Sequence, residues 1–239
     1  MLARQRGFVA DASHELRTPL AVLGAELELA GRPGRSRSEL ASAVANAEDE
    51  VARLTRLTND LLLLARSDEG RLPVRPAPAD VGLLLVSSAE RAAARAAEAG
   101  VRCAVDAPAG LVADLDEDRI RQAVDNLVDN ALRFAPPGSV VRAAAHAAGD
   151  NGGDLVIEVT DTGPGFPEEF LPHAFERFRR PDRGRARSDG GAGLGLAIVA
   201  AIAAAHGGAA SASNSADGGA VVSIRLPGAV AAALAAPPG

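Results

Sequence analysis

The first residue whose type and position could do chemistry is His14, in the stretch SHELRTPL near the start of the chain. A neutral imidazole is a competent nucleophile near neutral pH. His14 precedes Leu16, which opens an apolar helical stripe, by two positions, so we expect the ring on the flank of a helix and outside its core. This position fits an accessible nucleophile, and it equally fits a solvated surface histidine.

Asn126 and Asn130 form a second candidate pair, spaced i, i+4 in the helix-like stretch DNLVDNALR with Arg133 beside them. That spacing places both amides on one helix face. Asparagine is a mediocre helix former because its short amide competes for the backbone, so two on one face need a reason. Amide and phosphate oxygens suit Mg²⁺. The pair therefore predicts a metal and phosphate site, with a polar exposed face as the alternative.

The stretch DTGPGF directly follows an apolar, strand-like stretch, LVIEVT. Its glycines, Gly163 and Gly165, allow a sharp turn and a close approach of the backbone to a ligand. The Asp161 carboxylate at the strand end can accept a hydrogen bond from an exocyclic amine. The stretch thus predicts one wall of a ligand site, and an ordinary turn is the alternative.

The stretch GGAGLGLAIV is a glycine-rich loop that runs straight into a helix. Such a helix N-terminus presents free N–H groups and a positive dipole end to a phosphate. The loop is not a Walker A loop, because no Gly-Lys-Ser/Thr follows, and not a dinucleotide fingerprint, because no strand immediately precedes it. It predicts a phosphate-binding loop of another kind, with a glycine hinge as the alternative.

An arginine-rich segment, FERFRRPDRGRARSDG, separates the two glycine motifs. Its glycines and charges disfavour regular structure, and its cations could cover an anionic ligand, so we predict a mobile cationic lid. A solvated charge run is the alternative. The arginines are Arg177, Arg179, Arg180, Arg183, Arg185 and Arg187.

Two amphipathic helices must position His14. Apolar residues alternate at spacings of four and three, which is typical of one helical face. The stripes are Leu16, Leu20, Leu23 and Leu27, then Leu40, Val44, Ala47, Val51, Leu54, Thr58 and Leu61. A short turn at GRPGR separates them, so we expect an antiparallel helical hairpin. A lone hairpin leaves apolar residues uncovered, and pairing two hairpins into a four-helix bundle would cover them.

The nucleotide-type motifs lie in a region with a different pattern. A proline-rich stretch, residues 67–80, reads as a linker. Helices and strands then alternate, which predicts a two-layer α/β sandwich with a mixed or antiparallel sheet. We expect helices over 81–100, 116–135 and 195–208, and strands over 101–107, 139–148, 154–163, 209–215 and 220–227. Residues 228–239, rich in alanine and proline, predict a frayed tail.

Composition limits the classes of function. The net charge of −6 and pI near 5.3 argue against a nucleic-acid binder. The single cysteine, Cys103, cannot form an internal disulfide, so a reducing cytoplasm is the expected compartment. No apolar run reaches the roughly 18 residues of a membrane span. The motifs start almost at the first residue, and we expect a fragment whose upstream part is missing.

The order of these motifs along the chain resembles that of a known protein family. The chain resembles the catalytic core of a sensor histidine kinase of the two-component class over residues 8–227. SHELRTPL corresponds to the family's H box, NLVDNALRFA to the N box, DTGPGF to the G1 box, FERF to the F box and GAGLGLAIV to the G2 box.

The resemblance implies two functional domains. Residues 1–68 would form the dimerisation and phosphotransfer hairpin, 69–79 a linker, 80–227 a Bergerat-type ATP-binding domain and 228–239 a tail. His14 would be the phosphoacceptor and Glu15 its acid/base partner. Thr18 would orient water for dephosphorylation of a partner protein.

The resemblance also implies the nucleotide site. ATP and Mg²⁺ would be required, with Asn130 as the metal ligand and Asn126 alongside. Arg133 would reach the phosphates and Asp161 would recognise adenine. The remaining nucleotide-binding residues would be Gly163, Gly165, Phe175, Gly191, Gly193, Leu194 and Gly195. Ala192 and Phe134 depart from the common Ser/Thr and Tyr. The other histidines, His146, His173 and His206, match no phosphoacceptor position.

The implied function is ATP-dependent autophosphorylation of His14, then transfer to an aspartate of a response regulator receiver domain, with possible phosphatase activity. The implied partners are a second copy of the chain and that receiver. A missing upstream sensor region would place the intact protein in the cell membrane with this core in the cytoplasm. Two alternatives stay open: an ATP-driven clamp like those of gyrases and chaperones, and a degenerate kinase acting as a phosphatase or scaffold.

Overall fold

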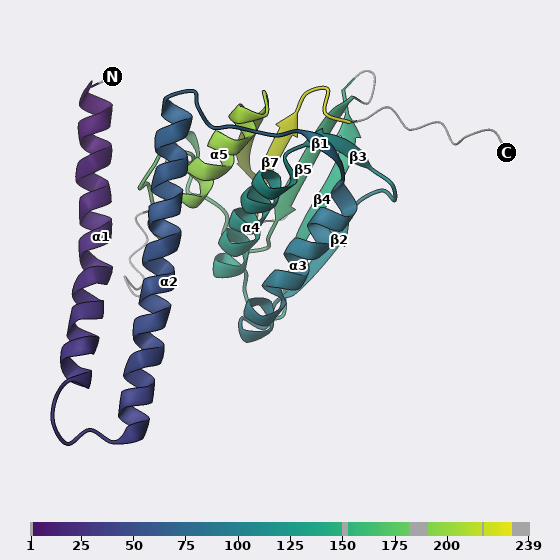
Figure 1. The fold of residues 1–239 in the computed structure, drawn as a ribbon. Helices are drawn as coiled ribbons and strands as arrows, with labels where there is room; N and C mark the ends of the chain where they lie inside the picture. The colour runs from purple at the N-terminus through teal and green to yellow at the C-terminus, as the bar shows by residue number, and fades with distance from the viewer. Residues whose placement is uncertain (1, 150–152, 182–190, 217, 231–239) are drawn as a thin grey trace. The chain divides into compact units, whose positions relative to one another are not determined.

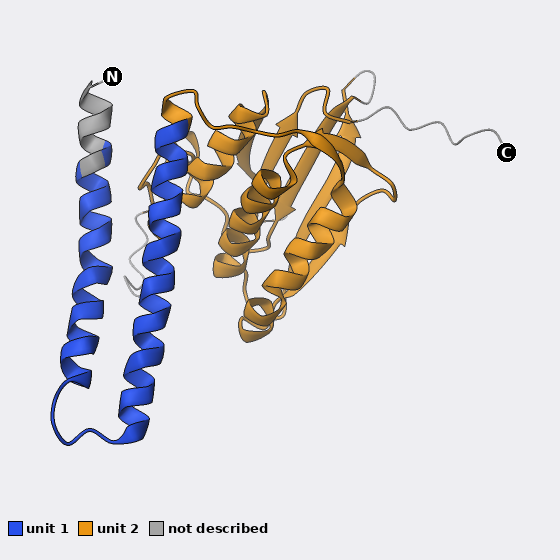
Figure 2. Cartoon of the chain, viewed as in Figure 1, with its two compact units in different colours: residues 1–66 blue, residues 67–239 orange. Residues whose placement is uncertain are grey.

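The computed structural model describes residues 2–149, 153–181, 191–216 and 218–230. It divides into two compact units, Met1–Arg66 and Ser67–Gly239, coloured separately in Figure 2. Within the described ranges, no helix carries the long apolar run that crossing a bilayer requires.

The first unit is a pair of long helices, α1 (Leu2–Ala30) and α2 (Arg37–Asp68). A capping box starts α2: the Ser36 N–H donates to Glu39 Oε2 at 2.8 Å, and the Glu39 N–H donates to Ser36 Oγ at 3.3 Å. The last two residues of α2 belong to the second unit. The predicted helical hairpin is confirmed, and α2 extends to the end of the range expected for it.

Many large apolar side chains of this hairpin remain in solvent. Leu20, Leu27 and Val44 are 55%, 56% and 54% exposed. Exposure is also high for Val22, Leu29, Leu40, Val51 and Leu62. These residues include much of the two predicted stripes, so the isolated hairpin leaves many of its stripe residues without cover.

The second unit is a two-layer α/β domain, as predicted. Its helices are α3 (Val81–Glu98), α4 (Glu117–Phe134), α5 (Gly195–Ala205) and the 3₁₀ turn η1 (Leu171–His173). Its strands are β1 (Ala77–Asp80), β2 (Arg102–Asp106), β3 (Val112–Leu115), β4 (Val140–Ala148), β5 (Asp154–Thr160), β6 (Ala209–Asn214) and β7 (Ala220–Leu226).

The main sheet of the second unit has five strands in the order β2-β4-β5-β7-β6. β2 and β4 are parallel and the other neighbours are antiparallel, so the sheet is mixed. Helices α3, α4 and α5 cover one face of it (Figure 1). Strand residues alternate accordingly: Leu155, Ile157 and Val159 of β5 are buried, and their neighbours are half-buried. The core therefore lies between the sheet and the three helices.

Two strands and a tail contact were not predicted. β1 lies partly within the segment expected to be a linker, and it pairs with β3 as a separate two-stranded sheet. Pro78 is compatible with β1 because β1 is an edge strand. On the other side of β3, the Asp114 N–H donates to the Ala229 carbonyl at 2.7 Å. Residues 228–230 are therefore anchored and not frayed, while 231–239 lie outside the described residues.

Candidate active site

Helix α4 is the element on which the site is built. Asp116 caps it by accepting the Arg119 N–H, and Ile120 and Leu127 pack its apolar face into the core. This burial turns the amide-bearing face of the helix to the edge of the core, where Asn126 and Asn130 are half-buried. Both asparagines therefore lie on one face with partial access to solvent.

Asn126 faces the G2 segment at the start of α5. Its Nδ2 donates to the Gln122 carbonyl at 3.0 Å. Its Oδ1 lies 3.4 Å from the position that a Cβ on Gly195 would take. One turn beyond Asn130, the Arg133 guanidinium lies 3.2 Å from the corresponding Cβ position of Gly191. The structure thus brings the predicted N and G2 residues together.

The G1 turn packs against the C-terminal end of α4, next to Arg133. A Cβ on Gly163 would lie 2.6 Å from the Phe134 carbonyl oxygen, so only glycine fits there. Asp161 is 4% exposed, and its Oδ1 accepts the Gly163 N–H at 2.7 Å and the Ala220 N–H at 3.3 Å. Within the described ranges, no donor is assigned to Asp161 Oδ2. The assigned hydrogen bonds of the carboxylate therefore all go to Oδ1.

The F and G2 segments are joined by their backbones. The Phe178 N–H donates to the Gly193 carbonyl at 3.0 Å. Phe178 has a φ of 59°, a strained value for a bulky residue, and Gly193 has a φ of 70°. A Cβ on Gly193 would lie 2.9 Å from the Arg179 carbonyl oxygen. Phe175, at the start of the F segment, is half-buried.

The predicted lid is only partly within the described structure. Arg183, Arg185 and Arg187 lie outside the described residues. Arg177 forms a bidentate pair with Asp68, with Nη1 to Oδ2 at 2.7 Å, and Arg179 pairs with Glu176 at 3.0 Å. Arg177 and Arg179, at the N-terminal end of the predicted lid, therefore both have carboxylate partners.

Glu176 is a local anchor for that base. His173 Nδ1 lies 2.7 Å from Glu176 Oε1, and Arg179 contacts the other oxygen. The hydrogen bond with His173 is the largest influence, and together with Arg179 it lowers the pKa of the Glu176 carboxyl below its ordinary value. Glu176 therefore remains charged, and it connects His173, before the F segment, with Arg179, directly after it.

The N-terminus of α5 offers backbone donors. Leu194 is the N-cap residue and makes no side-chain cap. The first-turn N–H groups of this 11-residue helix therefore have no side-chain acceptor from the cap. Buried Leu194 and Ile198 seat the helix in the core, which holds that end next to Asn126. Phosphate oxygens are the natural acceptors for such a terminus.

The donor set fits a Mg²⁺ ion that arrives with phosphates. In the described parts of the chain, no three His, Cys, Asp or Glu side chains gather where they could hold a metal. The amide oxygens of Asn126 and Asn130 are neutral, hard ligands, which suit Mg²⁺ when nucleotide phosphates and water complete its shell. The residues therefore fit a metal–nucleotide complex and do not fit a metal held by protein alone.

His14 lies on α1 in the first unit and is exposed to solvent. Glu15 is half-buried and Thr18 is exposed. No hydrogen bond between His14 and Glu15 is found in the described structure. Adjacent helix residues point about 100° apart, so the two side chains diverge. The accessibility of His14 agrees with the predicted flank position, and the pairing with Glu15 stays a prediction.

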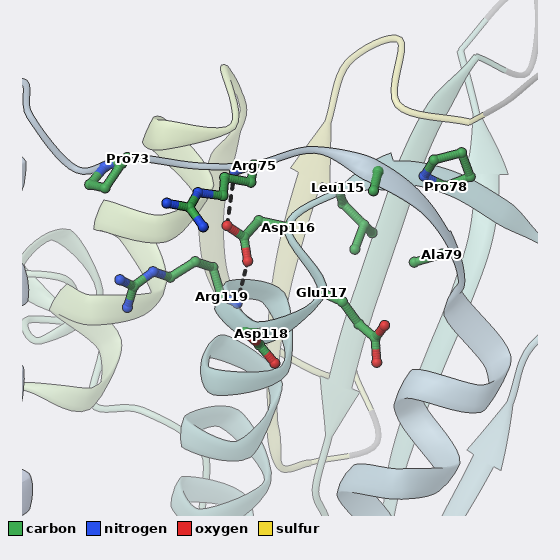
Figure 3. A pocket seen from close by; sticks show the side chains of 10 residues that line it. Pro73, Arg75, Pro78, Ala79, Leu115, Asp116, Glu117, Asp118 and Arg119 are labelled. Carbon is green, nitrogen blue, oxygen red and sulfur yellow. Dashed lines mark hydrogen bonds between the residues drawn. The ribbon is translucent and has the colours of Figure 1, made fainter.

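A pocket of the second unit lies away from these residues. It has a volume of about 630 Å³ and lies where β1, β3 and the N-terminus of α4 meet (Figure 3). Asp116 lies in its wall between Arg75 and Arg119. Its carboxylate accepts hydrogen bonds from their backbone N–H groups at 2.9 and 3.2 Å. None of the predicted nucleotide residues lines this pocket, so it is a feature of the linker attachment.

Sequence reasoning missed two polar residues that hold the site elements. His206, at the end of α5, accepts the Asp116 N–H with Nε2 at 3.1 Å, and its Nδ1 lies 2.8 Å from the Ile202 carbonyl. This connects the C-terminus of α5 to the N-terminus of α4. Asn214, at the end of β6, contacts both backbone groups of Phe166. Neither residue stands in a recognisable motif, so no sequence signal pointed to them.

Two family models match the chain. Residues 4–70 match the "His Kinase A (phospho-acceptor) domain". Residues 115–230 match the "Histidine kinase-, DNA gyrase B-, and HSP90-like ATPase". The second description alone would also cover gyrases and chaperones. The two matches in this order distinguish the chain from those ATPases.

Whole-chain relatives agree with these matches. The probable sensor histidine kinase TcrY of Mycobacterium tuberculosis is 41% identical over 223 residues, which are 93% of this chain and 46% of that protein. The chain therefore spans less than half of that relative. The structure of full-length ShkA in complex with AMPPNP is 32% identical, with a TM-score of 0.71 over 95% of this chain and 47% of that one.

A third similarity concerns the fold alone. The structure of the histidine kinase ThkA in complex with the response regulator protein TrrA is 19% identical, with a TM-score of 0.72 over 95% of this chain and 63% of that one. Matches to both family models, and a relative with 41% identity along almost the whole chain, agree on one assignment. The chain belongs to the sensor histidine kinase family.

Proposed function

We propose that this chain is an ATP-dependent protein-histidine kinase core that phosphorylates His14 and passes the phosphoryl group to an aspartate of a response regulator. The observation that carries the proposal is the gathering of three motifs around α4. Asn126 lies against Gly195, Arg133 against Gly191, and the Phe134 carbonyl against Gly163. These contacts bring three kinds of group to one site: the Asp161 carboxylate, which can accept from adenine, the amide oxygens of α4, and the N-terminus of α5.

Each group has a distinct role in holding ATP. Asp161 uses Oδ1 for backbone donors, so its Oδ2 accepts the exocyclic amine of adenine. Asn130 is the metal ligand, with Asn126 beside it, and a bound Mg²⁺ would neutralise charge on the phosphates. Arg133 and the N–H groups of Gly195 and α5 bind phosphate oxygens. Gly163, Gly165, Gly191, Gly193 and Leu194 shape the site, and Phe175 supports its rim.

The proposed transfer takes place in two steps. A ring nitrogen of His14 attacks the γ-phosphorus, the bond from that phosphorus to the bridging oxygen breaks, and ADP leaves. Glu15 receives the ring proton or stabilises the cationic phosphoimidazole. A receiver aspartate oxygen then attacks the same phosphorus, and the P–N bond breaks to restore His14. Thr18 is exposed one turn after His14. In the phosphatase reaction it would orient the water that hydrolyses the phosphoaspartate of the partner and releases inorganic phosphate.

We also propose the partners and the location. The exposed apolar face of the hairpin supports a homodimer in which two hairpins form a four-helix bundle. The ThkA–TrrA complex supports a response regulator as the acceptor, and the AMPPNP complex of ShkA supports ATP as the donor. The name of TcrY, a probable sensor histidine kinase, and its greater length support a sensor region in the intact protein. We propose that the intact protein lies in the cell membrane with this core in the cytoplasm.

The test is incubation of the chain with γ-labelled ATP and Mg²⁺. We expect acid-labile, alkali-stable label on the protein, lost at least 100-fold in His14→Gln because this variant lacks the proposed phosphoacceptor. The matched control is His146→Gln, which removes an exposed histidine of β4 and should leave labelling unchanged. Asp161→Asn should abolish ATP binding without dissociating the dimer. Phosphate release with no labelled protein would contradict the kinase and favour an ATPase.

A further inference from the structure

Asn214, the last residue of β6, forms two hydrogen bonds with the backbone of one distant residue. Its Oδ1 accepts the Phe166 N–H at 2.7 Å, and its Nδ2 donates to the Phe166 carbonyl at 2.8 Å. The residues are 48 positions apart in the sequence. Only a carboxamide carries one acceptor and one donor in the arrangement that a single peptide residue requires. Asn214 therefore acts as a clamp on Phe166.

The clamp closes the G1 turn, which runs from Asp161 to Phe166. Gly165 has a φ of 70°, and a Cβ there would lie 2.7 Å from Asn214 Oδ1. The turn thus folds directly onto the asparagine. Behind it, the Phe166 ring is buried and stacks on Phe170 with the centroids 5.8 Å apart. The far end of the turn therefore has a fixed backbone and a fixed side chain.

The other end of the turn is held by the same β6–β7 hairpin. The Asp161 N–H donates to the Ala220 carbonyl at 3.0 Å, and the Ala220 N–H approaches Asp161 Oδ1 at 3.3 Å. Gly219, with a φ of 92°, packs so closely that a Cβ would collide with the Asp161 carbonyl oxygen. Two connections, at Asp161 and at Phe166, therefore fasten the G1 turn to one hairpin.

We propose that Asn214 is a positioning residue for nucleotide recognition, which acts through the G1 turn to hold the Asp161 carboxylate toward adenine. The inference rests on the proposed function of this site. Without the clamp, no hydrogen bond holds the backbone at the Phe166 end of the turn, which keeps only the packing of the Phe166 ring on Phe170, and the glycines of the turn allow other conformations. The carboxylate would then meet the exocyclic amine less often in the correct orientation, so both affinity and base discrimination would fall.

The experiment compares Asn214→Ala with a matched control on the same strand. Ser211→Ala removes the hydrogen bond between the Ser211 and Ser223 hydroxyls, an exposed side-chain bond of β6 that does not touch the G1 turn. AMPPNP and the corresponding guanine nucleotide are titrated calorimetrically with Mg²⁺. Two hydrogen bonds of ordinary net strength correspond to about a tenfold change in a dissociation constant. We therefore expect Asn214→Ala to weaken AMPPNP binding about tenfold and to reduce the ratio of the affinities for the adenine and guanine nucleotides. Ser211→Ala should change neither.

Two further measurements separate positioning from simple loss of structure. Asn214→Asp keeps the acceptor for the Phe166 N–H and loses the donor, so its AMPPNP affinity should fall between wild type and Asn214→Ala. Transfer from already phosphorylated His14 to a receiver does not use the nucleotide site and should be unchanged in all variants. Equal AMPPNP affinity and equal base preference in Asn214→Ala and Ser211→Ala would overturn the inference and leave the proposed kinase intact. A wild-type chain that binds no AMPPNP would overturn both.

Discussion

The two units of the chain bury their apolar side chains to very different extents. In the hairpin, Leu20 and Leu27 are more than half exposed, at 55% and 56%. In the α/β unit, Ile120, Ile198 and Ile224 are completely buried. The hydrophobic residues are patterned correctly for their elements in both units. The difference is that three helices and a sheet enclose a core, whereas two helices can only cover one side of each other.

This contrast indicates where each unit obtains its stability. The α/β unit completes its own core, so its unfolding should not depend on protein concentration. The hairpin gains the remaining hydrophobic free energy only when another surface covers its apolar face. Substitutions in the two units should therefore change different observables.

The largest effect is expected from Ile120→Ala on α4. Truncating a fully buried isoleucine leaves a cavity, and we expect the unfolding free energy of the α/β unit to fall by about 2–5 kcal/mol. Chemical denaturation followed by circular dichroism measures this loss, which should be the same at all protein concentrations. The control is Val86→Ala on α3, where the side chain is 41% exposed and the cost should be below about 0.5 kcal/mol. A concentration-dependent loss for Ile120→Ala would weaken the distinction between the units.

A smaller effect is expected from the double variant Leu20→Ala with Leu27→Ala on α1. Both side chains are exposed in one chain and become buried if two hairpins associate. We expect the dimer to weaken by about tenfold to hundredfold, which is about 1.4–2.7 kcal/mol. Sedimentation at several concentrations measures it, with Glu28→Ala on the same helix as the control. If the double variant dimerises as tightly as wild type, the apolar face is not the dimer interface.

A third effect concerns Asp60 on α2, a strongly perturbed carboxyl of the hairpin. Burial raises its pKa from 3.8 to about 6, against a smaller opposing influence of Arg56. Between these two values the folded state binds more protons than the unfolded state, so stability falls as the pH rises from about 4 to about 6. Asp60→Asn should therefore raise the Tm by a few degrees at pH 7.5 and leave it unchanged at pH 4.

Thermal unfolding at the two pH values measures this difference. Asp49→Asn, on the exposed face of the same helix, removes the same charge and serves as the control. An equal shift for both variants would mean that general charge reduction, and not the burial of Asp60, is responsible. A shift for Asp60→Asn that persists at pH 4 would also contradict the assignment.

Most elements of both units follow from local patterns in the sequence. The four-and-three spacing of leucines predicted the hairpin, and the apolar stretch LVIEVT predicted the strand that is β5. The short strands β1 and β3 escaped prediction because four residues carry little periodic signal, and Pro78 argues against a strand. Their pairing depends on Asp80 meeting Val112, which no local pattern records.

The candidate site divides in the same way. Asn130, Asp161 and the glycines stand in motifs whose residue types are demanded by the chemistry of phosphate and adenine, so the sequence alone identifies them. The residues that hold those motifs in place have no such signature. Asn214 and His206 acquire their partners, Phe166 and Asp116, only when segments 48 and 90 positions apart come together.

The sequence by itself therefore indicated the family, a helical hairpin followed by an α/β region, and the residues proposed to have chemical roles, because periodicity and motif spacing are local properties of the chain. Only the tertiary structure decided which side of α4 faces α5, why Gly163 and Gly165 must lack side chains, and which polar groups fasten the G1 turn. Those features depend on contacts between segments that are distant in the sequence. The effect of one carboxamide, or of one missing Cβ, depends on which group the fold places next to it.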